Sequence, residues 1–205
     1  MIVAGDQLEE RQSTIPLDCW SHTLQLVLKV VLDEPQVSES LGSASTLVGH
    51  FRRSELATNS LKHEQKLRNP DTQVLLLTQM VVTRWNSQLE MASRLLQLRP
   101  SVTAVLLDKN ITKPSARLSL QLTEEQWSVL SDITPLLKTF AKATQLLTRE
   151  STPTLSQVPV LLQSMVTRAF ALKPGDTPLI ANLKESVREE VIERFSLTNE
   201  GNFRI

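Results

Sequence analysis

Residues 123–148, TEEQWSVLSDITPLLKTFAKATQLLT, predict one long helix whose start is marked in the sequence. Thr123-Glu124-Glu125-Gln126 is a capping box, in which the Thr hydroxyl accepts from a first-turn amide and the Gln side chain reaches back. Apolar residues then recur at helical spacing in two sets: Trp127, Leu130, Leu137 and Ala141, and Ile133, Leu136, Phe140 and Leu147. Pro135 lies inside this pattern and predicts a kink.

The same periodicity predicts helices on both sides of this stretch. The expected helices cover residues 13–34, 37–67 with a break near Gly49, 86–98, 100–110, 155–172 and 178–195. The first is expected to be capped by Ser13 or Thr14, to end at Pro35 and to carry one apolar stripe of Leu17, Trp20, Leu24, Val27, Leu28 and Val31. A turn is expected at Asn69-Pro70-Asp71. The run VLLLTQMVV at 74–82 is expected to be extended because β-branched residues cluster at its end, and residues 111–120 are expected to form a loop. The fold class is therefore mainly α, with at most one strand.

Composition limits what this chain does. It has 205 residues, 40% of them hydrophobic, 21% charged and 5 of them glycine, which is typical of a globular helical chain with its own core. The net charge is zero, which excludes a strongly basic nucleic-acid-coating protein. The distribution is uneven, because residues 51–68 carry +3 (five basic, two acidic) and residues 84–118 carry +4 (six basic, two acidic). Residues 184–200 carry −2 (three basic, five acidic).

The single cysteine excludes an internal disulfide and fits a reducing compartment, either cytosol or nucleus. No basic region followed by a long apolar run marks a signal peptide at the start. The apolar runs fall short of the roughly 18–20 residues that a membrane helix needs.

The first chemical motif is Cys19-Trp20-Ser21-His22, on the helix predicted at 13–34. Cys19 and His22 share a helix face and would supply two zinc ligands, but a zinc site needs about four. The remaining histidines, His50 and His63, are distant in sequence. A Cys–His nucleophilic pair would need a third group to orient the base, and none is apparent. The residues alone favour a buried cysteine beside a partly satisfied histidine.

The second motif is Arg84-Trp85-Asn86-Ser87. A Trp indole stacks on an unpaired base, and a neighbouring guanidinium binds phosphate through two hydrogen bonds. The structural alternative makes Asn86 or Ser87 a helix N-cap and Trp85 a core residue. Taken alone, the motif leaves both interpretations open.

The two motifs in this order resemble hAT-superfamily DNA transposases, especially the zinc-finger BED-domain proteins derived from them. Five segments carry the resemblance: CWSHTLQL at 19–26, TRWNS at 83–87, MASRLL at 91–96, EQW with LLKTF at 125–140, and TPTLS at 152–156. Ala92 stands where the family pattern has Leu, and Thr139 where it has Pro. The resemblance extends from about residue 1 to 195.

The resemblance implies an RNase H-like core interrupted by a largely helical insertion domain. Residues 1–86 would be an edge of that core with the Cys-x-x-His helix, and residues 87–205 the insertion domain. It further implies that the catalytic acids, the BED zinc finger and the dimerisation region fall outside this chain. We therefore expect no catalysis from this chain alone and no metal or other cofactor bound by it. Homo-oligomers would form only through regions outside it.

The resemblance also implies DNA binding in the nucleus. The candidate DNA-binding residues are Cys19, His22, Arg84, Trp85 and Asn86, with the indole of Trp85 against a flipped base of double-stranded DNA. The expected role is transcriptional regulation without transposition, with neither a membrane nor a small-molecule substrate involved. The alternative is a helical protein–protein interaction module with no DNA role. Salt separates the two, because phosphate-driven binding weakens steeply as salt rises.

Overall fold

The computed structural model describes residues 17–82, 84–147, 154–195 and 197. Its helices are α1 (Leu17–Leu32), α2 (Pro35–Arg53), α3 (Glu55–Arg68), α4 (Trp85–Gln97), α5 (Arg99–Leu107), α6 (Pro114–Leu120), α7 (Glu124–Leu147), α8 (Thr154–Ser164), the π-helical turn η1 (Met165–Ala169) and α9 (Pro178–Arg194). Within these residues there is no strand, and the β-structure is limited to isolated bridge residues, among them Val81 paired with Arg84. The prediction of a mainly α fold is confirmed.

Helix α7 has the start and length that its sequence predicts. The Thr123 hydroxyl accepts from the Gln126 amide at 3.1 Å, and the Gln126 side-chain oxygen accepts from the Thr123 amide at 3.1 Å. The Gln126 side-chain nitrogen also donates to the Ser43 hydroxyl on α2 at 3.1 Å, so the cap ties two helices together. The helix continues through Pro135, which is exposed.

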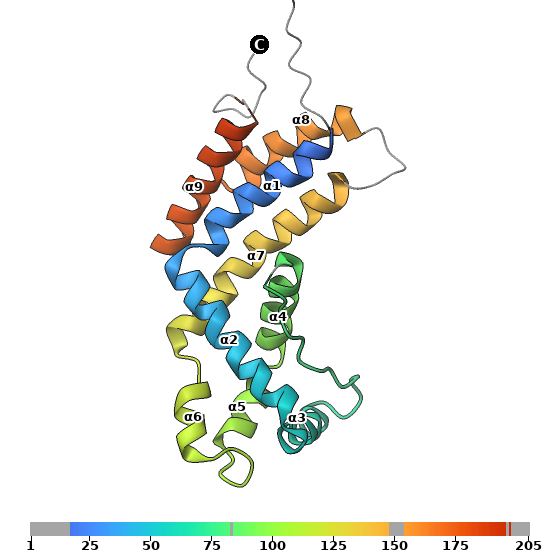
Figure 1. Cartoon of the computed structure of the whole chain (residues 1–205), viewed down its shortest axis with the longest axis vertical. Coiled ribbons are helices and arrows are strands. Elements are labelled where there is room, and N and C mark those ends of the chain that lie inside the picture. Colours follow the sequence, from blue (N-terminus) through green and yellow to red (C-terminus); the bar gives the residue numbers. More distant parts are fainter. Residues whose placement is uncertain (1–16, 83, 148–153, 196, 198–205) are drawn as a thin grey trace, which may run out of the picture.

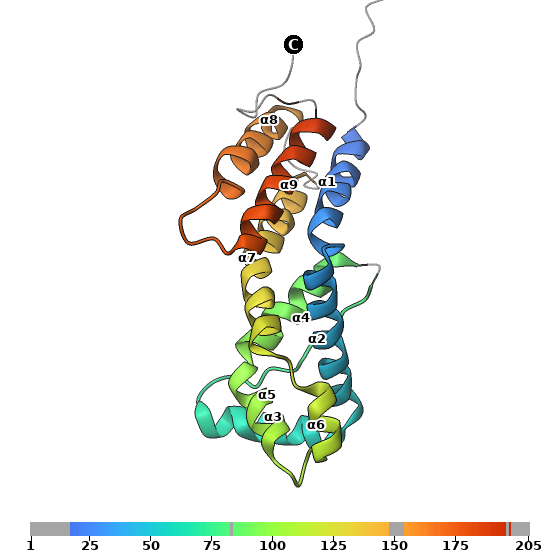
Figure 2. The ribbon, with the colours of Figure 1, turned by 90° about the vertical axis from the view of Figure 1, so that its left-hand side faces the viewer.

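One hydrophobic core extends over the described residues, and α7 packs against α1, α2 and α4 within it. At one end of the molecule, the C-terminal half of α7 forms a bundle with α1, α8, η1 and α9 (Figures 1 and 2). Helices α3, α5 and α6 lie at the other end. Phe140 of α7 meets Phe170 after η1 with ring centroids 5.3 Å apart. Trp20 of α1 meets Phe195 at 5.5 Å. The apolar stripe expected on α1 is buried from Trp20 to Val31.

Three expected boundaries were wrong. The chain breaks between α2 and α3 at Ser54, not at Gly49, because Ser54 caps both helices: its amide donates to the carbonyls of His50 and Phe51, and its hydroxyl accepts from the Ala57 amide. Gly49 remains inside α2. Residues 111–120, expected to be a loop, contain α6, which starts at Pro114 and buries Leu120. The helix expected at 155–172 changes to the π-helical turn η1 after Ser164.

Other local expectations hold. Pro35 lies at the start of α2, with the Glu34 carboxylate accepting from the Val37 amide at 3.0 Å. The turn expected at Asn69-Pro70-Asp71 is present, and Asn69 accepts from the Thr72 amide at 3.2 Å. The cap expected at Ser13 or Thr14 lies outside the described residues. Among the described residues, no helix is both long enough and apolar enough to cross a membrane.

Candidate nucleic-acid interface

The second motif is reached through an extended segment, residues 73–80, that side chains hold in place. The Gln65 amide group pairs with both backbone groups of Leu75, accepting from its N–H and donating to its C=O, each at 2.9 Å. Arg94 of α4 donates to the Leu76 carbonyl at 3.1 Å, and Gln79 donates to the Ser45 hydroxyl on α2 at 2.6 Å. The segment expected to be extended is therefore extended, although it pairs with helices and forms no strand.

A tight turn then presents Arg84 at the start of α4. The Arg84 amide donates to the Val81 carbonyl at 2.8 Å. The Ser87 hydroxyl accepts from the Val81 amide at 2.7 Å and donates to the Arg84 carbonyl at 2.6 Å. The N-cap position of α4 is Arg84, whose side chain makes no capping bond. The alternative that placed the N-cap at Asn86 or Ser87 is wrong, because both lie in the first turn of the helix.

The turn leaves Arg84 and Asn86 exposed, with Trp85 half-buried between them and packed against the core. Among the described residues, Arg84 has no acidic partner within 4.0 Å. The backbone amides of Trp85 and Asn86 have no hydrogen-bond partner there either, and they point from the positive end of a 13-residue helix. An anionic, aromatic ligand would be complementary to this site, which combines the Arg84 guanidinium, the two backbone amides and the partly exposed indole of Trp85.

The first motif lies elsewhere. His22 is exposed on α1, and the side chain of Cys19 lies outside the described part of the chain. Both views place the start of α1 near the end of the molecule where α8 and α9 lie, whereas α4 lies about halfway along it (Figures 1 and 2). The fold therefore does not bring the two motifs into one site.

Metal ligands do not gather in the part of the chain that the structure describes, where no group of three or more His, Cys, Asp or Glu is placed to hold an ion. His50 lies on α2 and His63 on α3. Burial, followed by the nearby charge of Arg53, lowers the pKa of His50. The last turn of α2 also carries Arg52 and Arg53, which supply positive charge at this end of the helix.

Two functional candidates were missed from sequence, namely Arg52 and Arg53. The sequence shows them as a mere pair of basic residues, but the fold places them at the end of α2, beside Gln79 of the extended segment. Both are exposed, and within the described residues neither has an acidic partner within 4.0 Å. Their position could not be read from spacing, because it depends on where residues 73–80 run.

No protein-family model, curated protein or solved structure matches this chain.

Proposed function

We propose that this chain binds DNA through the start of α4, as part of a nuclear protein derived from a hAT transposase. The observation that carries the proposal is the arrangement of Arg84, Trp85 and Asn86, in which a free guanidinium and a free amide flank a half-open indole. Arg84 would hold a backbone phosphate, and the open part of Trp85 would stack on a base turned out of the duplex.

In this proposal, residues 1–86 are an edge of an RNase H-like core and residues 87–205 a helical insertion domain. Cys19 and His22 belong to the core edge and would contact DNA separately from Arg84. The role in the whole protein is transcriptional regulation. That this chain by itself catalyses no reaction and binds no metal stays a prediction.

The test uses a short duplex carrying one unmatched base and an otherwise identical intact duplex. Fluorescence anisotropy is measured at several salt concentrations. Arg84→Ala should weaken binding to both duplexes and make the logarithmic salt slope shallower by about 0.9, the value for one lost phosphate contact. The matched control is Arg117→Ala on α6, an arginine away from α4. Equal losses in both variants would mean that the start of α4 has no special role.

The stacking role needs its own variant. Trp85→Leu keeps an apolar side chain for the core and removes the flat indole. We expect it to lose the preference for the unmatched duplex, since stacking contributes about 1–3 kcal/mol per base. Thermal melting checks that the fold is retained. An unchanged preference in a folded Trp85→Leu protein would contradict the base-stacking role.

One observation favours the alternative, a protein-interaction module. Large apolar side chains are exposed along the approach to α4: Leu76 at 52%, Val81 at 47% and Val82 at 77%. Exposed apolar side chains in a row mark protein contact surfaces more often than DNA contacts. Absence of DNA binding, together with binding to a protein ligand that does not weaken as salt rises, would favour this second function.

A further inference from the structure

Two adjoining hollows lie between α2 and the extended segment, and together they form a groove that the DNA proposal does not use. Their volumes are about 420 and 550 Å³, and Arg52 and Gln79 line both. The larger hollow is polar, with Ser45, Thr46 and Arg53 around it. Its floor is Gly49, where an added Cβ would lie 3.2 Å from the end of the Arg53 side chain.

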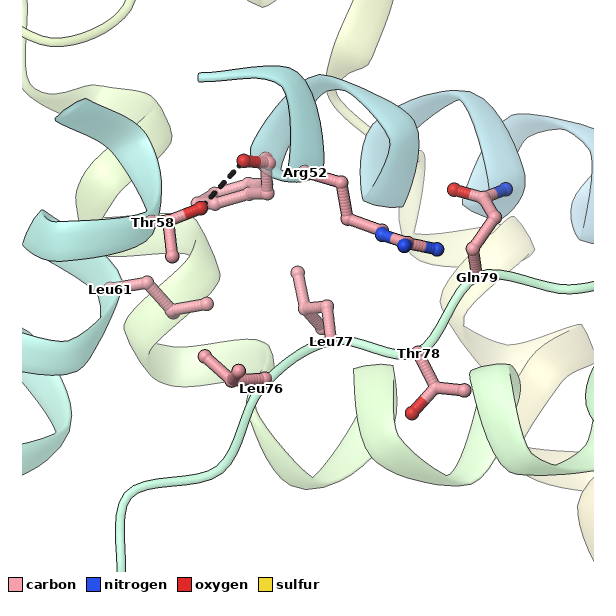
Figure 3. A pocket seen from close by; sticks show the side chains of 8 residues that line it. Arg52, Thr58, Leu61, Leu76, Leu77, Thr78 and Gln79 are labelled. Atoms are coloured by element: carbon pink, nitrogen blue, oxygen red, sulfur yellow. Dashed lines mark hydrogen bonds between the residues drawn. The ribbon is translucent and has the colours of Figure 1, made fainter. Parts of the chain in front are cut away.

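The smaller hollow is apolar on one side. Leu61 of α3 and Leu76 and Leu77 of the segment point into it, while Arg52 reaches across toward Gln79 (Figure 3). Leu77 is 8% exposed and Leu76 52% exposed, so one leucine seals the hollow and the other forms its open rim. The open space of this hollow, about 420 Å³ in volume, lies between Leu61 and Leu77 (Figure 3). A sugar-phosphate backbone would leave these leucines without an apolar partner.

The charge of the groove is also unmatched. Arg68, Arg99 and Arg194 pair with carboxylates, as Arg99 does with Glu124 at 2.6 Å, whereas the described residues offer Arg52 and Arg53 no such partner. Two guanidinium groups at the edge of an apolar hollow are complementary to a carboxylate next to an apolar side chain.

The backbone beside the groove is open to pairing. Among the described residues, positions 73–80 make no backbone-to-backbone hydrogen bond, and side chains satisfy only Leu75 and the Leu76 carbonyl. The N–H and C=O groups from Thr78 to Met80 have no partner in that part of the chain. An extended chain with free backbone groups is a template on which a second extended chain adds.

We propose that this groove binds an extended peptide segment of a partner protein, in which acidic and leucine-sized side chains alternate. The peptide backbone pairs with Thr78–Met80. One leucine-sized side chain enters the hollow between Leu61 and Leu77, and carboxylates of the peptide pair with Arg52 and Arg53. This inference is independent of DNA binding at Arg84.

The test measures fluorescence anisotropy of a labelled peptide of alternating Glu and Leu, with the full chain titrated in. Saturable binding is expected. Three altered peptides should each bind at least about tenfold more weakly, the change that follows from about 1.4 kcal/mol. They carry Gln for Glu, Ala for Leu, or N-methylated backbone nitrogens at every second position.

Protein variants locate the site. Arg52→Glu with Arg53→Glu should abolish binding of the acidic peptide and create binding of an equivalent Lys and Leu peptide. Arg168→Glu, a single charge reversal on the exposed surface of η1, should leave binding unchanged. Gly49→Leu should narrow the larger hollow without removing charge, because its Cβ would lie 3.2 Å from the end of the Arg53 side chain and 3.5 Å from the Gln79 side-chain oxygen. Thermal melting checks that this variant retains the fold.

Several results would overturn the proposal. These are the absence of saturable binding, binding that both Gly49→Leu and the double arginine variant leave intact, and displacement of the peptide by oligonucleotides that bind more tightly. The last result would assign Arg52 and Arg53 to nucleic acid instead. Loss of DNA binding in Arg84→Ala alone does not bear on the groove, so the two proposals fail separately.

Discussion

The two ends of the molecule treat their charged side chains in opposite ways. At the α9 end, the Lys184 side chain is 5% exposed and its ammonium binds both carboxylate oxygens of Asp176 at 2.7 Å and the Ala171 carbonyl at 3.2 Å. At the end of α2, Arg52 and Arg53 are exposed, with no acidic partner among the described residues.

The difference separates a charge whose partner lies within the fold from charges that remain accessible to a ligand. A buried charge is stable only when the chain itself supplies its partner, so the ammonium of Lys184 is satisfied within the fold. An exposed arginine loses little by remaining unpaired in water, and it stays available to a ligand. Substitutions at the first end should therefore change unfolding, and those at the second should change binding.

The largest effect is expected from Phe140→Ala, which lies at the α9 end of the molecule. Phe140 is fully buried against Phe170, so its removal leaves a cavity and should cost about 3–5 kcal/mol of unfolding free energy. Urea unfolding measures it. Leu118→Ala, at a position 79% exposed on α6, should change stability by less than about 0.5 kcal/mol. Similar costs for the two would contradict the buried position of Phe140.

A smaller effect is expected from Gln65→Leu, which tests whether Gln65 keeps residues 73–80 in place. The substitution removes both partners of the Leu75 backbone and should cost about 1–3 kcal/mol, the penalty for unsatisfied polar groups. It should also expose residues 73–80 to proteolysis and weaken peptide binding. Lys62→Leu, on an exposed face of the same helix, is the control. Unchanged proteolysis would mean that Gln65 does not hold the segment.

Thr123→Ala should cost about 1 kcal/mol, because it removes the hydroxyl that accepts from the Gln126 amide at the start of α7. Because α7 joins the two ends, the loss should appear in global unfolding. Thr103→Ala, at an exposed position on α5, is the matched control. If the two variants unfold alike, the capping box does not contribute.

The ion pair between Asp176 and Lys184, at the α9 end, should make the stability of the protein depend on pH. Hydrogen bonds from the Lys184 ammonium, and then from the Lys173 amide, lower the pKa of Asp176. A lowered folded-state pKa means that the stabilisation is present above the unfolded value of about 3.9 and is lost as pH falls through the folded value. The difference in melting temperature between the native protein and Asp176→Asn should therefore shrink below about pH 4. A constant difference across acidic pH would contradict this linkage.

The smallest effect on stability is expected from Arg84→Ala, below about 0.5 kcal/mol, because the side chain is exposed and has no partner among the described residues. The same variant should lose DNA affinity, which is the opposite of the result expected for Phe140→Ala. A marked loss of stability would show that Arg84 serves the fold, and the DNA proposal would lose its main residue.

Much of the helical fold followed from local patterns. The mainly α class, the span of α7 and its capping box, the buried stripe of α1 and the start of α4 near Asn86 all depend on residues within a few positions of each other. The break at Ser54 was missed because a serine within a helical pattern has no spacing signal of its own. The residue types of the second motif were enough to select Arg84, Trp85 and Asn86 as candidates. Their exposure could not be predicted from the sequence.

The sequence by itself determined most of the helical segments, with α6 as the exception, because hydrogen bonds and apolar spacing within one helix involve near neighbours. Only the tertiary structure decided what the extended segment does. Gln65 holds Leu75 across 10 positions, and Gln79 reaches Ser45 across 34. These long-range bonds place residues 78–80, whose backbone groups have no partner among the described residues, along the groove that Arg52 and Arg53 line. Because the residues that line this groove are far apart in the chain, the groove forms only when tertiary packing brings them together.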